Sequence, residues 1–120
     1  MNQEIILKDF SVLEGLMLGK YPGILIEMAS EVISMIRILN KVPVITSAFR
    51  EGDSGVHGSF RGLDFRTHSL TSSEIENIVE KINSRYQYDS KRPEMKVLMY
   101  HDIGKGLHLH LQSHPNTVRK

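Results

Sequence analysis

The sequence contains no cysteine and no tryptophan, and it has only four prolines among its 120 residues. Without cysteine, the chain cannot form a disulfide framework, a thiolate zinc site, an iron–sulfur cluster or a cysteine nucleophile. Any metal ion must therefore be bound by histidine, aspartate or glutamate side chains. Six histidines are present, which makes such a site chemically accessible.

An excess of charge of one sign is also absent, because 15 basic residues balance 14 acidic ones and leave a formal charge of +1. No run of Lys or Arg is longer than a pair. A protein held mainly by nucleic-acid phosphates or by anionic lipid would be more basic, so we expect no nucleic-acid partner.

Long apolar runs are lacking as well. The most apolar stretch, 24–39, carries five polar residues, which makes membrane insertion unexpected. The first ten residues lack a basic segment followed by an apolar one, so we expect no signal peptide and synthesis in the cytoplasm. The composition, 40% hydrophobic and 24% charged, is that of a globular protein. The length predicts one domain over 1–120.

Hydrophobic periodicity predicts two main helices, over 22–40 and 72–86, the second opening with a capping box. Alternating or β-branched segments predict strands over 43–49, 63–66, 95–101 and 107–112, the last two forming a hairpin. The glycine-rich segment 51–62 is expected to be a loop, and the tail to Lys120 is expected to be loose. The fold class is therefore α+β, a small domain with an antiparallel sheet packed by two helices.

The last predicted strand places His108 and His110 on one face and three leucines on the other. Two imidazoles side by side on a strand face can serve one site. The alternative is an ordinary solvated strand face that carries two histidines.

A second group consists of His57 and Asp64, separated by Gly58 and Gly62. The two side chains converge if the loop bearing His57 folds back over the strand bearing Asp64, and the glycines permit that. Together with one imidazole from the last strand they supply three nitrogen or oxygen ligands, which leaves a fourth position for water. That is the pattern of a catalytic zinc site.

Ser47 and Arg50 lie at the end of the first predicted strand, 43–49. The guanidinium of Arg50 offers a fork that suits a carboxylate, with the Ser47 hydroxyl nearby in sequence. The alternative is a surface arginine and a turn serine.

The order of these motifs, TSAFR at 46–50, then His57 and Asp64, then His108-Leu109-His110, resembles the zinc peptidases of the Hedgehog/D-Ala-D-Ala-peptidase fold. The resemblance covers about residues 43–112. This family includes D-alanyl-D-alanine carboxypeptidases and the L-alanyl-D-glutamate endopeptidases of phage endolysins. It implies a zinc-dependent hydrolase that acts on a peptidoglycan stem peptide or cross-link.

The resemblance also implies individual roles. The zinc ligands would be His57, Asp64 and His110, and His108 would be a neighbouring residue that binds or polarises the reacting group. Ser47 and Arg50 would hold a carboxylate or amide of the substrate. The absence of a signal peptide then suggests a phage or prophage product that acts at the bacterial cell wall.

The sequence departs from the carboxypeptidase branch at Leu107 and Leu109, where that branch has a glutamate and a tryptophan. Asp102 is the carboxylate that we nominate as general base in place of that glutamate, with Glu51 and Asp53 as further candidates. Loss of the glutamate also motivates an alternative from another class, a zinc-stabilised binding or virion structural module without catalytic activity.

Overall fold

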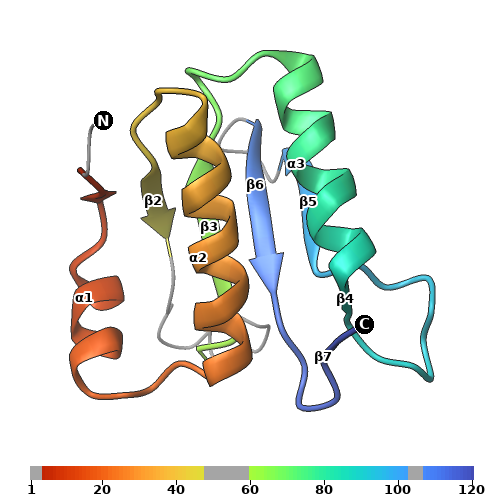
Figure 1. Cartoon of the computed structure of the whole chain (residues 1–120). Helices are drawn as coiled ribbons and strands as arrows, with labels where there is room; N and C mark the ends of the chain where they lie inside the picture. The colour runs from red at the N-terminus through yellow and green to blue at the C-terminus, as the bar shows by residue number, and fades with distance from the viewer. Residues whose placement is uncertain (1–3, 48–59, 103–106) are drawn as a thin grey trace.

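A five-stranded sheet in the order β1-β2-β3-β6-β5 forms the centre of the computed structural model, which describes residues 4–47, 60–102 and 107–120 (Figure 1). Two short strands form a separate pair. The strands are β1 (Ile6–Leu7), β2 (Val44–Ser47), β3 (Gly62–Arg66), β4 (Tyr86–Gln87), β5 (Leu98–Asp102), β6 (Leu107–Gln112) and β7 (Val118–Arg119). The helices are α1 (Phe10–Met17), α2 (Gly23–Ile38) and α3 (Ser72–Arg85).

The sheet is mixed. Strands β2, β3, β6 and β5 pair antiparallel, which confirms the four predicted strands and the β5–β6 hairpin. The expectation of a purely antiparallel sheet is wrong, because the unpredicted strand β1 pairs parallel with β2. A parallel neighbour requires a crossover connection, and α1 and α2 supply it between β1 and β2.

Helices α2 and α3 cover one face of the sheet (Figure 1). On this face the buried side chains of the sheet pack with those of the helices into one core. The predicted capping box of α3 is confirmed, since the Thr71 hydroxyl accepts from the Glu74 backbone and the Glu74 carboxylate accepts from the Thr71 backbone. The largest fully buried side chains are Tyr86, Phe65, Leu25, Met28, Ile36, Ile78, Ile82, Leu98, Leu109, Leu111, Val12 and Val32.

The third helix, α1, was not predicted. Its sequence, FSVLEGLM, is apolar around most of its circumference and has no clear polar face. The Asp9 side chain caps it by accepting from the Ser11 backbone at 2.9 Å. Only Val12 and Gly15 are buried, and a Cβ added at Gly15 would lie 2.5 Å from the Tyr21 ring. Glycine is therefore required where α1 meets that ring.

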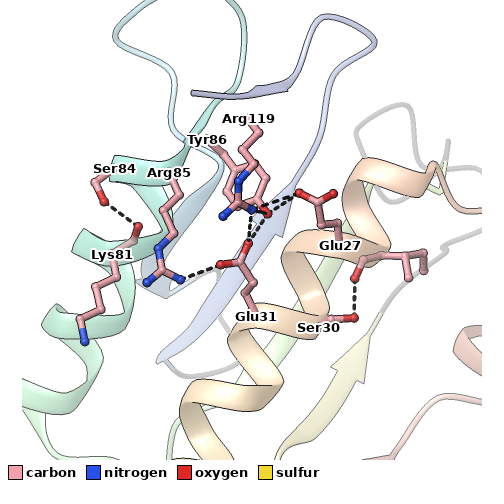
Figure 2. A network of polar contacts seen from close by, with 9 residues as sticks. Glu27, Ser30, Glu31, Lys81, Ser84, Arg85, Tyr86 and Arg119 are labelled. Atoms are coloured by element: carbon pink, nitrogen blue, oxygen red, sulfur yellow. Dashed lines mark hydrogen bonds and ion pairs between the residues drawn. The ribbon is translucent and has the colours of Figure 1, made fainter.

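The C-terminal tail is ordered, which corrects the expectation of a loose end. Strand β7 pairs antiparallel with β4, directly after α3. The Arg119 guanidinium donates to the Tyr86 hydroxyl at 2.7 Å and to the Glu31 carboxylate at 3.1 Å (Figure 2). We call Glu27, Glu31, Arg85, Tyr86 and Arg119 the C-terminal network. The side chain of Arg119, the penultimate residue, thus adds to the β4–β7 pairing in fixing a tail that the sequence predicts to be loose.

None of the helices in the described ranges is long and apolar enough to cross a membrane. The structure is thus a small α+β domain with a mixed sheet and, in the part described, three helices.

Candidate functional site

Three adjacent strands place the predicted site residues in one row across the sheet. Ser47 on β2 pairs with Asp64 on β3, and Asp64 pairs with His110 on β6. His108 lies two residues before His110 on the same strand and pairs with Arg66. Because directly paired residues of neighbouring strands point to the same face, the sheet itself brings the predicted carboxylate and imidazoles together.

The side chains of Asp64, His108 and His110 converge on one carboxylate oxygen, and we call these three residues the histidine cluster. His110 Nδ1 lies 2.8 Å from Asp64 Oδ1. His108 Nε2 lies 3.6 Å from the same oxygen. The strand alternation thus sends Leu109 and Leu111 of β6 into the core under the helices and the two histidines to the opposite face, as predicted, whereas Leu107 at the start of the strand is exposed.

The histidine cluster is buried. The exposed fraction is 3% for Asp64, 8% for His108 and 7% for His110. The sequence predicted a face directed outward or into a cleft, whereas these side chains have little contact with water. A buried carboxylate is costly unless a positive charge or several hydrogen-bond donors lie next to it. The properties of this site therefore depend on the groups next to the Asp64 carboxylate, which include the imidazoles of His108 and His110.

A fourth residue, Gln112, contacts the second ring nitrogen of His110. The Gln112 amide nitrogen donates to the Lys96 carbonyl at 2.9 Å, and its oxygen faces His110 Nε2 at 3.3 Å. The two ring nitrogens of His110 thus face one oxygen each, Nδ1 that of Asp64 and Nε2 that of Gln112.

Sequence reasoning missed the role of Gln112. Its signal is the strand alternation, because Gln112 continues the face that carries His108 and His110. Histidine ligands commonly donate their second ring nitrogen to a partner of this kind, which fixes the tautomer and orients the ring. Gln112 is itself 6% exposed, so its amide is held within the protein.

The other predicted residues are placed only in part. His57 and Arg50 lie outside the described residues, as do the further base candidates Glu51 and Asp53. Ser47 is placed by its strand pairing with Asp64. Asp102, the nominated general base, ends β5 and pairs with Leu107, the residue before His108.

The donor set of the histidine cluster suits a zinc ion. Zinc is commonly bound by imidazole nitrogen and carboxylate oxygen, and here an atom of each type lies 2.8 Å from the other. Within the ranges that the structure describes, no group of three histidine, cysteine, aspartate or glutamate side chains that could hold a metal ion is found. The third predicted ligand, His57, lies outside those ranges.

A second polar region lines an open groove of about 520 Å³ formed by α2, α3 and β7. Four of its charged groups, Glu27, Glu31, Arg85 and Arg119, are engaged in the C-terminal network (Figure 2). Glu31 accepts from Arg85 at 2.6 Å and from Arg119 at 3.1 Å. This mutual pairing makes the histidine cluster the better candidate site.

Comparison of the chain with protein-family models, with curated proteins and with solved structures gave no match. The function has to be inferred from the chemistry of the site.

Proposed function

We propose that the chain is a zinc-dependent peptidase that hydrolyses peptidoglycan stem peptides or cross-links, of the D,D-carboxypeptidase or L,D-endopeptidase type. The observation that carries this proposal is the facing pair formed by Asp64 Oδ1 and His110 Nδ1, 2.8 Å apart. A buried carboxylate and an adjacent imidazole would supply two ligands of a divalent cation, with Gln112 next to the second ring nitrogen. The motif order along the chain supplies the reaction class.

In this proposal Asp64, His110 and His57 hold the zinc ion. A zinc ion held there would polarise the scissile carbonyl and activate a water. The protein contributes Asp64 and His110 as a buried pair, because β3 and β6 pair through five consecutive residues that place the two opposite each other. Gln112 keeps the His110 ring in the orientation that directs Nδ1 to Asp64.

His108 is assigned to the reacting group and not to the metal. Its Nε2 lies 3.6 Å from Asp64 Oδ1, so the ring borders the zinc ligands without forming the close contact that His110 makes. An imidazole at this position can hydrogen-bond the carbonyl oxygen as negative charge develops on it. Asp102 remains the nominated base, and Ser47 and Arg50 remain the groups assigned to a substrate carboxylate or amide.

The finer fold assignment and the setting belong to the same proposal. We propose the Hedgehog/D-Ala-D-Ala-peptidase fold, which is supported by the α+β class and by the motif order. We also propose that the chain is encoded by a phage or prophage and acts at the bacterial cell wall. Mass spectrometry of purified virions and of lysates distinguishes a virion component from a protein that is present only at lysis.

The test of activity uses purified muropeptides and the full zinc-loaded chain, with products followed by mass spectrometry. We expect a mass change equal to the addition of one water and release of the corresponding fragment. The same incubation with Asp64→Asn, or with a chelator, is expected to leave the muropeptides intact. Unchanged muropeptides with a wild-type chain that has bound zinc would refute the enzymatic proposal for this substrate.

A second candidate is a zinc-stabilised binding or virion structural module. The observation in its favour is Leu107, which is 51% exposed and stands where the carboxypeptidase branch has a glutamate. A leucine cannot accept a proton, so the ligand set would persist without that base. If the second candidate is correct, zinc raises the melting temperature of the wild-type chain but not that of His110→Ala, and neither protein hydrolyses muropeptides.

A further inference from the structure

Helix α1 presents large apolar side chains to solvent along one side of the molecule. The exposed fractions are 73% for Phe10, 41% for Leu13, 45% for Leu16 and 78% for Met17, and the following Leu18 is 64% exposed. We call these five residues the α1 surface. Figure 1 shows α1 at the outer edge of the molecule, away from the layer formed by α2 and α3.

Helical spacing places Phe10, Leu13, Leu16 and Met17 on one face of α1. Leu18 lies beyond the exposed Glu14, at the margin of this face. The opposite side of the helix is fixed to the protein by Val12, which is 1% exposed, and by Gly15 against the Tyr21 ring. The single charged residue of the helix is Glu14. The apolar side chains are therefore held outward and cannot turn into the core.

The size of the α1 surface matches one half of a dimer interface. A side chain of this size has a full accessible area on the order of 150–200 Å², so the exposed fractions leave roughly 500 Å² of apolar surface. A standard interface buries about 800 Å² on each partner, and about 65% of a homodimer interface is apolar. One copy of the chain thus supplies the apolar area that a stable homodimer needs.

We infer that the chain forms a two-fold symmetric homodimer through α1. The occupant of the α1 surface is a second copy of the same surface, with the two helices antiparallel across the two-fold axis. Leu13 then lies near the axis, and Phe10 of one copy lies against Met17 of the other, a favourable pairing of a ring with a thioether. This inference is independent of the proposed function, because the histidine cluster lies on β3 and β6.

A membrane surface is a less suitable occupant. Helices that lie in a bilayer interface usually carry several lysines or arginines on their polar face. Helix α1 has eight residues, with neither lysine nor arginine among them. The absence of basic residues in the helix favours protein over anionic lipid.

Sedimentation equilibrium of the full chain tests the inference. We expect a reversible dimer for the wild type, and at least about tenfold weaker association for Phe10→Glu, because a charge would be buried against Met17 of the other copy. Ile38→Glu is the matched control, since Ile38 is 74% exposed on α2, and it is expected to dimerise like the wild type. A wild type that stays monomeric up to about 1 mM would overturn the inference.

A cross-link gives a second measurement that does not depend on affinity. The chain has no cysteine, so a single introduced thiol can form only an intermolecular disulfide. Oxidation of Leu13→Cys is expected to give a covalent dimer, whereas oxidation of Ile38→Cys is expected to leave a monomer. Equal yields of covalent dimer from the two cysteine variants would contradict the inferred dimer. Binding of the wild-type chain to phosphatidylglycerol vesicles would also contradict it, if Phe10→Glu abolishes that binding in a cosedimentation assay.

Discussion

Two polar clusters in this protein use similar chemistry for different ends. In the C-terminal network, the carboxylates of Glu27 and Glu31 accept from the Tyr86 hydroxyl and from Arg119, and Arg85 completes the set. Two negative groups thus face two positive ones. The network joins α2 to α3 and to the two short strands, so its charges hold parts of the fold together.

In the histidine cluster, the balance between negatively and positively charged side chains differs. Asp64 is a buried carboxylate whose nearest cluster partner, His110 at 2.8 Å, has its other ring nitrogen directed at the amide oxygen of Gln112. Acceptors therefore lie on both sides of that imidazole. A network with matched charges stabilises the fold, whereas a neighbouring imidazole and carboxylate are groups that can also bind a cation. The following predictions test that difference.

The largest expected effect separates the two histidines of β6. In His108→Ala we expect zinc binding to persist and muropeptide hydrolysis to fall by about 10²–10⁴-fold, because the reacting group loses its polar neighbour. In His110→Ala we expect both zinc and hydrolysis to be lost. Metal content and initial rates of the two purified variants check this, and equal zinc loss in both would assign His108 to the metal instead.

Zinc-linked stability separates the two clusters. At free zinc 100–1,000 times the Kd, we expect the free energy of unfolding of the wild type to rise by about 3–4 kcal/mol, because zinc binds the folded ligand set. Asp64→Asn preserves the shape of the side chain and removes its charge, so this increment should vanish. Urea unfolding with and without zinc measures it. The prediction fails if the asparagine variant gains as much stability from zinc as the wild type does.

In the C-terminal network, Tyr86→Phe is expected to lower the free energy of unfolding by about 1–2 kcal/mol. The substitution removes a hydroxyl that two carboxylates and Arg119 contact, while the buried ring is kept. The zinc-dependent increment should remain that of the wild type. Chemical denaturation with and without zinc checks both statements, and loss of zinc binding in this variant would show that the two clusters are coupled.

The smallest expected effect is a pH dependence. Burial tends to raise the pKa of Glu31, but hydrogen bonds from Tyr86, Arg85 and Arg119 outweigh it and hold this pKa below its ordinary value of 4.5. The stability from this ionised carboxylate is present above about pH 4.5 and is lost as pH falls through the lowered pKa. Glu31→Gln should therefore be less stable than wild type at pH 7, with a smaller difference at low pH. A constant difference across this range would exclude the ionised carboxylate as its origin.

Much of the fold was predictable from the sequence, because the long elements carry strong local signals. The leucine and histidine alternation of 107–112 placed β6 and its two faces, and Thr71 with Glu74 marked the start of α3. Helix α1 was missed because its eight residues are apolar around most of the helix and show no polar face. The strands β1, β4 and β7 were missed because two residues are too few to show a periodicity. Their positions depend on tertiary contacts such as those of Arg119.

One part of the candidate site, the proximity of Asp64 and His110, was predictable from the sequence. Motif order paired Asp64 with His110, and the strand register places them opposite each other. The burial of the histidine cluster and the role of Gln112 were not predictable. Both depend on which side chain meets which atom across strands, and a sequence pattern fixes faces but not the direction of an amide group.

The most direct test of the account is the metal content per chain, determined by elemental analysis. Wild type, Asp64→Ala, His110→Ala and His57→Ala would be purified identically, with Tyr86→Phe as the control from the C-terminal network. We predict about one zinc per chain in wild type and in the control, and a sharp fall in each of the other three. A wild type that retains no metal after zinc is offered and the excess is removed would contradict the account.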